Sequence, residues 1–534
     1  MKSKNYRISR LRSVLTAVTG LSLAAAAAIF VLNSVDAQRI VGRGPAVPTQ
    51  RGIYHGVKRE ITVGKPMSVK EAAKLDLARN YNRPFAADND GPGGKPEFLE
   101  GHGVPIAKST SQSPLAATAP VPSASGVSAP PMQTFKGEYL SSGSIPPDTH
   151  GAVGTTHIVT VSNDRMRIQT RDGVEISRAT LTSFWSGVPL PGGAAVSAFD
   201  PKILFDRFNG RFIFVASANA QDNSSSMLLA VSQTSDPTGS WFRYSLPAVP
   251  NQSGTSPLWI DYPSVGFNKN WITINENVFQ FNGTGNTYAR SDIYAVDKQA
   301  AYNGTLGSIT AFQGLIANCA SDPNPDTALS CGFTMAPAVT EDNTTDTEYI
   351  VEDWDAQFGQ LRMSKLTGTP ASPVLTVGTS FPQSTQSWRF SAARIGTTGG
   401  YAPQRQQSAH LVSGTRIQTN DSRIQNVVLR NGSLWTTHTV MLSTLPQPAG
   451  TQIGGVTEGP NRDNHSAVQW WQIDPTQEPG TSNPAQVLQR GRIEDPTADN
   501  CHNGTGGTMT TGTCTSTAAQ VGTFFAFPNI SVNQ

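Results

Sequence analysis

The chain has 534 residues, with 40 Lys and Arg against 38 Asp and Glu, so its formal net charge is +2. This balance excludes the strongly basic surface expected of a nucleic-acid-binding protein. Charged residues make up only 15% of the chain, below the roughly 25% usual for soluble domains, while Gly and Pro number 49 and 37. These values disfavour a helical bundle, a coiled coil or a multi-span membrane protein, and they favour a secreted all-β protein.

Residues 1–37 have the pattern of a secretory signal peptide. Basic residues between Lys2 and Arg12 precede an apolar run from about Val14 to Leu32, and small residues end at Ala37. The apolar run is long for a signal peptide, so an uncleaved membrane anchor is the alternative. Beyond this segment we expect no membrane association, and the protein should be extracellular or periplasmic.

Four cysteines agree with export to an oxidising compartment. The simplest pairing is local, with Cys319 joined to Cys331 and Cys501 to Cys514, each disulfide closing one polar loop. Metal binding is the alternative, but the cysteines lack the close Cys and His spacing of a zinc site.

Residues 38–133 show no strand periodicity and are predicted to form a pro-segment or flexible spacer. Within it, Glu71 to Tyr81 is predicted to be one short helix. The part from Lys108 to Met132 is rich in Ser, Ala, Pro and Thr, which is typical of a linker.

Residues 134–534 contain many short alternating runs separated by turn residues, which is typical of β-strands. A strand, a tight polar turn and a second strand recur at 147–161, 200–215, 261–274, 337–351 and 422–437. Asn209-Gly210 and Asn431-Gly432 are strong hairpin signals within this pattern. Since further strands follow each copy, the repeat predicts four-stranded antiparallel blades in series, a β-propeller. A β-sandwich or an irregular barrel is the alternative.

A sixth copy of the first strand occupies residues 527–533. We therefore expect about six blades, of which the last is incomplete. Strands near Gln133 to Tyr139 could instead complete the ring. We favour an incomplete blade, because ring closure usually borrows one strand whereas three are missing.

Several motifs in this region resemble a family of secreted bacterial β-propeller proteins. They lie at residues 146–154, 235–241, 261–263 and 471–474, and the resemblance covers about residues 140–534. It implies a propeller fold and an extracellular setting, and it carries no catalytic residues. The stretch at 235–241 also resembles the Asp-box turns of sialidase-type propellers, without their full pattern.

In a propeller, the starts of first strands and the ends of second strands converge at one end of the central channel, here called the mouth. The starts supply Asp148, His150, Asp200, Asp261, Tyr262 and Arg423. The ends supply Asn275, Glu276, Asn277, Glu352, Asp353, Trp354, Asp355 and His438. Convergent polar groups in a concave site predict ligand binding.

Three functions compete for these residues. The first is recognition of an extracellular glycan or protein, with ligand contacts from Asp148, His150, Asp200, Tyr262, Trp354, Arg423 and His438. The second is a polysaccharide hydrolase or lyase whose acid and base are paired carboxyl groups, either Glu276 with Asp261 or Glu352 with Asp355.

The third function is binding of Ca²⁺ by the same carboxylates, and no other cofactor is expected. Against all three stands a local role, since Asp at a strand start often caps a turn. Asp206, Asp236 and Asp474 are predicted to be turn residues of this kind. The sequence favours extracellular binding through the mouth, keeps the hydrolase or lyase as the alternative, and does not decide whether the chain is an enzyme.

Overall fold

A computed structural model of the chain describes residues 52–78, 134–135, 137, 147–283, 285–315, 333–355, 359–381, 388, 419, 421–442, 465–477, 486–495 and 523–532. The predicted signal peptide and all four cysteines lie outside these residues, so the cleavage site and the disulfide pairing stay predictions. None of the helices in the described ranges has the length and apolar character needed to cross a membrane.

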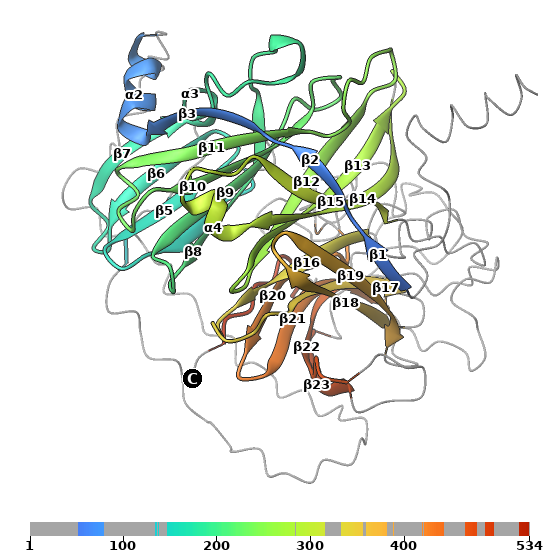
Figure 1. Cartoon of the computed structure of the whole chain (residues 1–534). Coiled ribbons are helices and arrows are strands. Elements are labelled where there is room, and N and C mark those ends of the chain that lie inside the picture. The colour runs from blue at the N-terminus through green and yellow to red at the C-terminus, as the bar shows by residue number, and fades with distance from the viewer. Residues whose placement is uncertain are drawn as a thin grey trace, which may run out of the picture.

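The described part of the chain is dominated by antiparallel sheets of four consecutive strands, the predicted blades (Figure 1). Blade 1 comprises β4 (His150–Val153), β5 (His157–Val161), β6 (Arg165–Thr170) and β7 (Glu175–Thr180). Blade 2 comprises β8 (Ala198–Asp206), β9 (Arg211–Ala218), β10 (Ser226–Ser232) and β11 (Ser240–Pro247). Blade 3 comprises β12 (Leu258–Phe267), β13 (Trp271–Phe281), β14 (Asn286–Asp297) and β15 (Ser308–Leu315).

Two further blades follow in the described ranges. Blade 4 comprises β16 (Phe333–Thr340), β17 (Glu348–Asp355), β18 (Gln360–Thr369) and β19 (Ser372–Phe381). Blade 5 comprises β20 (Ile424–Arg430), β21 (Ser433–Leu442), β22 (His465–Ile473) and β23 (Val487–Ile493). The predicted hairpin turn at Asn431-Gly432 is confirmed, because both residues have positive φ, 51° and 73°, as a type I′ turn requires.

The first strands of successive blades lie side by side. β4 contacts β8, and β8 contacts β12. β12 pairs in parallel with β16 through Phe267 and Val339, and β16 pairs in parallel with β20 through Ala338 and Val427. Because the first strands are parallel neighbours while the later strands of each blade lie farther out, the architecture is a β-propeller, as predicted.

Aromatic packing fixes blade 1 against blade 2. The ring centroids of Trp185 and Phe214 are 5.2 Å apart, and those of Phe184 and Trp241 are 5.9 Å apart in an edge-to-face arrangement. All four side chains are buried in one hydrophobic cluster. Buried aromatic pairs of this kind contribute about 0.5–1.5 kcal/mol beyond their area, so the strand starts of the two blades hold fixed positions.

The N-terminal residues 52–78, which we call the strap, are not a spacer in the structure. β1 (Gly52–His55) pairs antiparallel with β19, β2 (Val57–Glu60) with β15, and β3 (Thr62–Ser68) with β11. The strap thus adds an outer strand to blades 4, 3 and 2 in turn, and it is the blue ribbon that crosses them in Figure 1. The expectation that residues 38–133 lack strands was wrong here, because these short edge strands take their pairing from blades far along the chain.

The helix α2 (Val69–Ala78) ends the strap and lies against β7 of blade 1. The sequence predicted a helix at Glu71 to Tyr81, two residues later. It begins earlier because Ser68 and Glu71 form a capping box, in which the Ser68 N–H and hydroxyl each donate to the Glu71 carboxylate at 2.8 Å. Asp76 then accepts from the Thr180 N–H and hydroxyl, at 2.9 and 2.6 Å.

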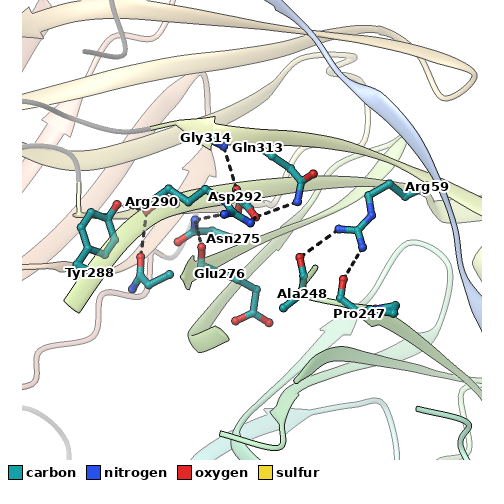
Figure 2. Close-up of polar contacts among 12 residues, drawn as sticks. Arg59, Pro247, Ala248, Asn275, Glu276, Tyr288, Arg290, Asp292, Gln313 and Gly314 are labelled. Atoms are coloured by element: carbon teal, nitrogen blue, oxygen red, sulfur yellow. Dashed lines mark hydrogen bonds and ion pairs between the residues drawn. The ribbon is translucent and has the colours of Figure 1, made fainter. Parts of the chain in front are cut away.

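Two buried arginines fasten the strap to blade 2. Arg243 of β11 donates to the Lys65 carbonyl oxygen at 2.9 Å and to the Phe184 and Ser186 carbonyl oxygens. Arg59 of β2 donates to the Pro247 carbonyl oxygen at 2.5 Å, as Figure 2 shows. The guanidinium groups therefore satisfy backbone acceptors that the blade edges would otherwise leave unpaired.

Three short helical segments interrupt the described sheets: α3 (Leu181–Phe184), η1 (Pro191–Gly193) and α4 (Lys298–Tyr302). α4 carries Lys298 and Tyr302 to the buried Asp206 at the end of β8, with donor–acceptor distances of 3.0 and 2.9 Å. Asp206 also accepts from two turn amides, so its predicted turn role is confirmed and a buried ion pair is added.

Residues 523–532, which include most of the predicted sixth first strand, have no strand assignment. They lie against blade 5, where Asn426 of β20 exchanges two hydrogen bonds with the Ile530 backbone, at 3.0 and 3.3 Å. Phe527 has φ of 52° immediately before a proline, as Tyr262 does in β12. A sixth blade remains a prediction.

Candidate functional site

The first strands share a local irregularity near their starts. Asp148, Asp200, Tyr262 and Thr334, at equivalent places in four consecutive blades, have φ between 45° and 62°. The pairing register shifts at the same places in β8, β12 and β16. Left-handed residues in bulges redirect side chains and often occur beside functional sites, which makes the strand starts at the mouth the candidate site.

Three aspartates from three blades meet there, and we call Asp148, Asp200 and Asp261 the acidic row. The Asp200 carboxyl group hydrogen-bonds to those of Asp148 and Asp261 on either side. The row is fixed by backbone and amide donors: the Tyr262 N–H donates to Asp200 at 3.0 Å, and Asn163 donates to Asp148. Two carboxyl groups can hydrogen-bond only if one holds a proton, so the row shares protons.

The pKa values in the row agree with proton sharing. Burial, together with the neighbouring carboxyl group, raises the pKa of Asp148 and of Asp200 to about 6. Burial also raises the pKa of Asp261, although the hydrogen bond from Asp200 and the charge of Arg423 oppose the shift. Asp148 and Asp200 therefore titrate near pH 6 rather than near pH 4, and the pKa of Asp261 is shifted in the same direction.

Glu276 is a fourth carboxyl group directed toward this row. It follows Asn275 and precedes Asn277 on β13, and both asparagines accept hydrogen bonds from blade 4, from the Met335 and Thr334 N–H groups. Since side chains alternate along a strand, Glu276 faces blade 2, where the Ser217 hydroxyl donates to its Oε2 at 3.1 Å.

The other oxygen of Glu276 has no partner. The side chain is 0% exposed and Oε1 makes no hydrogen bond. Burial, followed by the charges of Asp261, Asp200 and Asp292, raises the pKa of Glu276 well above its usual value and so favours its protonated form. Figure 2 shows its carboxyl group turned away from the neighbouring Asp292 cluster.

Asp292, by contrast, is fully engaged in structural contacts. Arg290 binds both of its carboxylate oxygens, at 2.9 and 3.1 Å, while Gln313 and the Gly314 N–H donate at 3.1 Å (Figure 2). This cluster fixes the Asp292 side chain within blade 3.

Two cationic side chains lie over the ring of Tyr262, beside the acidic row. Lys202 Nζ lies 4.9 Å and the Arg423 guanidinium carbon 4.2 Å from the centroid of its ring, and the Tyr262 hydroxyl donates to Gln425 at 3.1 Å. Arg423 is held in a two-pronged pair by Asp421, at 2.7 and 2.6 Å, which outweighs burial and raises the pKa of Arg423. The aromatic ring and its two cations thus adjoin the acidic row from blades 2, 3 and 5.

The two histidines predicted at the mouth bind protein groups. Nδ1 of His150 lies 2.9 Å from the Ile203 carbonyl oxygen of the adjacent first strand. His438 is fully buried: Trp471 Nε1 donates to its Nε2 at 3.1 Å, and its Nδ1 lies 2.8 Å from the Ser422 carbonyl oxygen. Burial lowers the pKa of both histidines to about 4, so they are neutral, and His438 has no ring nitrogen left for a ligand.

The second predicted carboxyl pair stays a prediction, because Asp355 ends β17 and its side chain is outside the described residues. Its partner Glu352 is buried and accepts from Arg362 Nε. The guanidinium carbon of Arg362 also lies 3.7 Å from the Trp354 ring centroid, so Trp354 shares the same contact.

No group of three or more His, Cys, Asp or Glu side chains in the described ranges is placed to hold a metal ion. Asp236 and Asp474 are turn residues as predicted, since each accepts from the N–H and hydroxyl of the threonine two positions later.

Sequence reasoning missed Asn163, Lys202 and Asp421. Asn163 follows the second strand of blade 1, so the rule that selected Asn275 would have found it. Asp421 is two residues before Arg423, a spacing that a search for ion pairs could have examined. Lys202 gave no sequence signal, because its position depends on the bulge at Asp200.

Comparison with known proteins found no matching family model and no match among curated proteins. Among solved structures, a GH43 endo-arabinanase from Bacillus licheniformis is 13% identical, covers 55% of this chain and 88% of its own, and has a TM-score of 0.26. A xylan β-1,4-xylosidase from Bacillus halodurans is 10% identical over 62% of this chain and 53% of its own, with a TM-score of 0.27. A subtype N10 neuraminidase-like protein of A/little yellow-shouldered bat/Guatemala/060/2010 is 10% identical over 65% of this chain and 82% of its own, with a TM-score of 0.27. Similarity at this level carries no argument, so the propeller assignment rests on the strand topology above.

Proposed function

We propose that this chain is an extracellular glycan-binding protein whose ligand contacts the acidic row and Tyr262. The observation that carries the proposal is the meeting of half-buried carboxyl groups from three blades, which share protons and lie beside an aromatic ring with two cations.

Sugar hydroxyl groups both donate and accept hydrogen bonds. A carboxyl group that is protonated near pH 6 can also do both, whereas an ionised carboxylate only accepts. Asp148 and Asp200 hold such protons, and Lys202 and Arg423 add donors. The mouth therefore matches a hydroxyl-rich ligand more closely than an apolar protein surface.

Glycan hydrolysis is a second candidate, favoured by the different surroundings of Glu276 and Asp261. Burial raises the pKa of both groups, but the hydrogen bond from Asp200 and the charge of Arg423 oppose the shift at Asp261, whereas neighbouring carboxylates add to the shift at Glu276. In such an enzyme Glu276 would protonate the leaving oxygen and Asp261 would act as base or nucleophile.

A glycan-array screen at pH 6, followed by chromatographic analysis of incubated hits, tests both functions. Asp200→Asn keeps the left-handed backbone, which asparagine tolerates, and keeps an acceptor for the Tyr262 N–H. Asp474→Asn removes the same charge from an exposed turn of blade 5 and serves as control.

We expect one glycan class to bind, at least tenfold more weakly to Asp200→Asn and equally well to Asp474→Asn. Binding that Asp200→Asn leaves intact would refute the assignment of the site. Product formation that disappears in Glu276→Gln, with the melting temperature retained, would establish hydrolysis, and binding without products would establish recognition alone.

A further inference from the structure

The charge balance at the acidic row is strongly uneven. Four carboxyl groups, those of the row and Glu276, are electrostatically coupled to one another across blades 1, 2 and 3. The two neighbouring cations are Lys202, whose charge acts on Asp148, and Arg423, whose charge acts on Asp261 but which is also paired with a fifth carboxyl group, that of Asp421. The row therefore holds more negative charge than the surrounding protein compensates, and protons fill the difference.

A second observation, which does not depend on the charge balance, concerns the buried carboxyl group of Glu276. Glu276 Oε1 is completely buried and unpartnered, although burying a polar atom without a hydrogen bond costs about 1–3 kcal/mol. The strand alternation of β13 turns this oxygen toward blade 2. There Ser217, its hydrogen-bond donor, is the cross-strand neighbour of Phe199, which precedes Asp200. The charges of Asp261 and Asp200 both act on Glu276, so this carboxyl group, which has no second partner among the described residues, adjoins the row.

We propose that the ligand of this site is a glycan that carries free amino groups, whose ammonium binds among Asp200, Asp261 and Glu276. An ammonium group has three donors and no acceptor, so it pairs with carboxylate oxygens once these groups have released their protons. It would supply the missing positive charge through charge-assisted hydrogen bonds. This inference rests on the proposed function and names the substrate class of the same site.

Binding of an ammonium group must release protons. A positive charge beside the row favours the ionised carboxylates, so the pKa values of Asp148 and Asp200 fall from about 6 when the ligand binds. Near pH 6 the complex then holds fewer protons than its separate components, and affinity rises with pH until the ligand amine itself loses its charge. The other charged or titratable groups that act on the row from neighbouring strands are His150, Lys202, Asp292 and Arg423.

Isothermal titration calorimetry with chitosan tetrasaccharide and its fully N-acetylated counterpart tests this assignment. The two ligands share the sugar backbone and differ in charge. We expect at least tenfold tighter binding of the amine form at pH 6, and proton release measured as a dependence of heat on the ionisation enthalpy of the buffer. Asp200→Asn should remove the preference, and Asp474→Asn should retain it.

Equal affinity for the two tetrasaccharides would overturn the inference. If neutral glycans bind and Asp200→Asn weakens them, the proposed function stands and only the amino-sugar assignment fails. If no glycan binds, both fail. Tight binding of Ca²⁺ alone that Asp200→Asn abolishes would assign the row to a metal ion and also overturn the inference.

Discussion

Replacement of Arg243 by methionine tests whether the strap is an integral part of the propeller. Arg243 is 1% exposed, and its guanidinium group donates to three carbonyl oxygens, that of Lys65 in the strap, that of Phe184 at the end of α3 and that of Ser186 just after α3. Methionine retains most of the apolar stem and removes every donor. Leaving these acceptors buried without the charged donor costs about 3–5 kcal/mol.

The corresponding change in melting temperature follows from the size of the fold. With about 2.1 cal/mol/K per residue over the roughly 300 described residues, the unfolding entropy is about 0.6 kcal/mol/K. The melting temperature should therefore fall by about 5–8 °C, as measured by calorimetry. Limited proteolysis should give new cleavage between residues 52 and 78, because the released strap becomes accessible.

Arg207→Met is the matched control. Arg207 pairs with Glu341 across two first-strand ends, but its side chain is 46% exposed, so its removal should cost at most about 1 kcal/mol. An Arg243→Met protein that melts within 1 °C of the parent and resists cleavage in the strap would refute the reasoning.

Three further predictions follow from other contacts. Because the pKa of Asp200 is raised, the folded protein holds a proton on this group more tightly than the unfolded protein does, so its stabilising effect is present below about pH 4 and disappears as pH rises through about 6. Asp200→Asn should therefore reduce the fall in melting temperature between pH 4 and 7. An unchanged pH profile of the melting temperature would contradict the raised pKa. Lys298→Met should lower the free energy of unfolding, measured in urea, by about 3–5 kcal/mol, because the Asp206 charge stays buried without its partner. Adding Asp206→Asn should recover more than half of this loss, and an unchanged free energy in Lys298→Met would mean that the ion pair does not stabilise the fold. Ser68→Ala should cost about 1 kcal/mol and speed amide exchange in α2, whereas unchanged exchange would mean that the capping box is dispensable.

The blade pattern could be predicted because the signals are local. Hairpin turns such as Asn431-Gly432 and the alternating runs beside them specify strand pairs within a few residues, and each predicted pair became the first and second strands of a blade. The strap could not be found in this way. Its strands are four to seven residues long, and their pairing partners lie about 180 to 320 residues later.

The candidate site was predicted in part for the same reason. Propeller geometry indicated which strand ends converge, and this brought the acidic row and Tyr262 together. It did not indicate toward which neighbouring blade each side chain points. Glu276 and Asn277 are consecutive, yet Glu276 faces blade 2 whereas Asn277 is hydrogen-bonded to blade 4. His438 shows the other limit, because burial between Trp388 and Trp471 depends on packing that a strand pattern does not encode.

The course of the strap sets an order of assembly. Residues 52–55 are made before any blade, yet the strand they pair with, residues 372–381, is among the last parts of blade 4 to be synthesised. During translation, β1 therefore stays without its partner strand until more than 300 further residues have been made, and β2 and β3 do so until blades 3 and 2 have been made. A segment that precedes the blades in the chain can thus dock completely only after the outer strands of blades 2, 3 and 4 are in place.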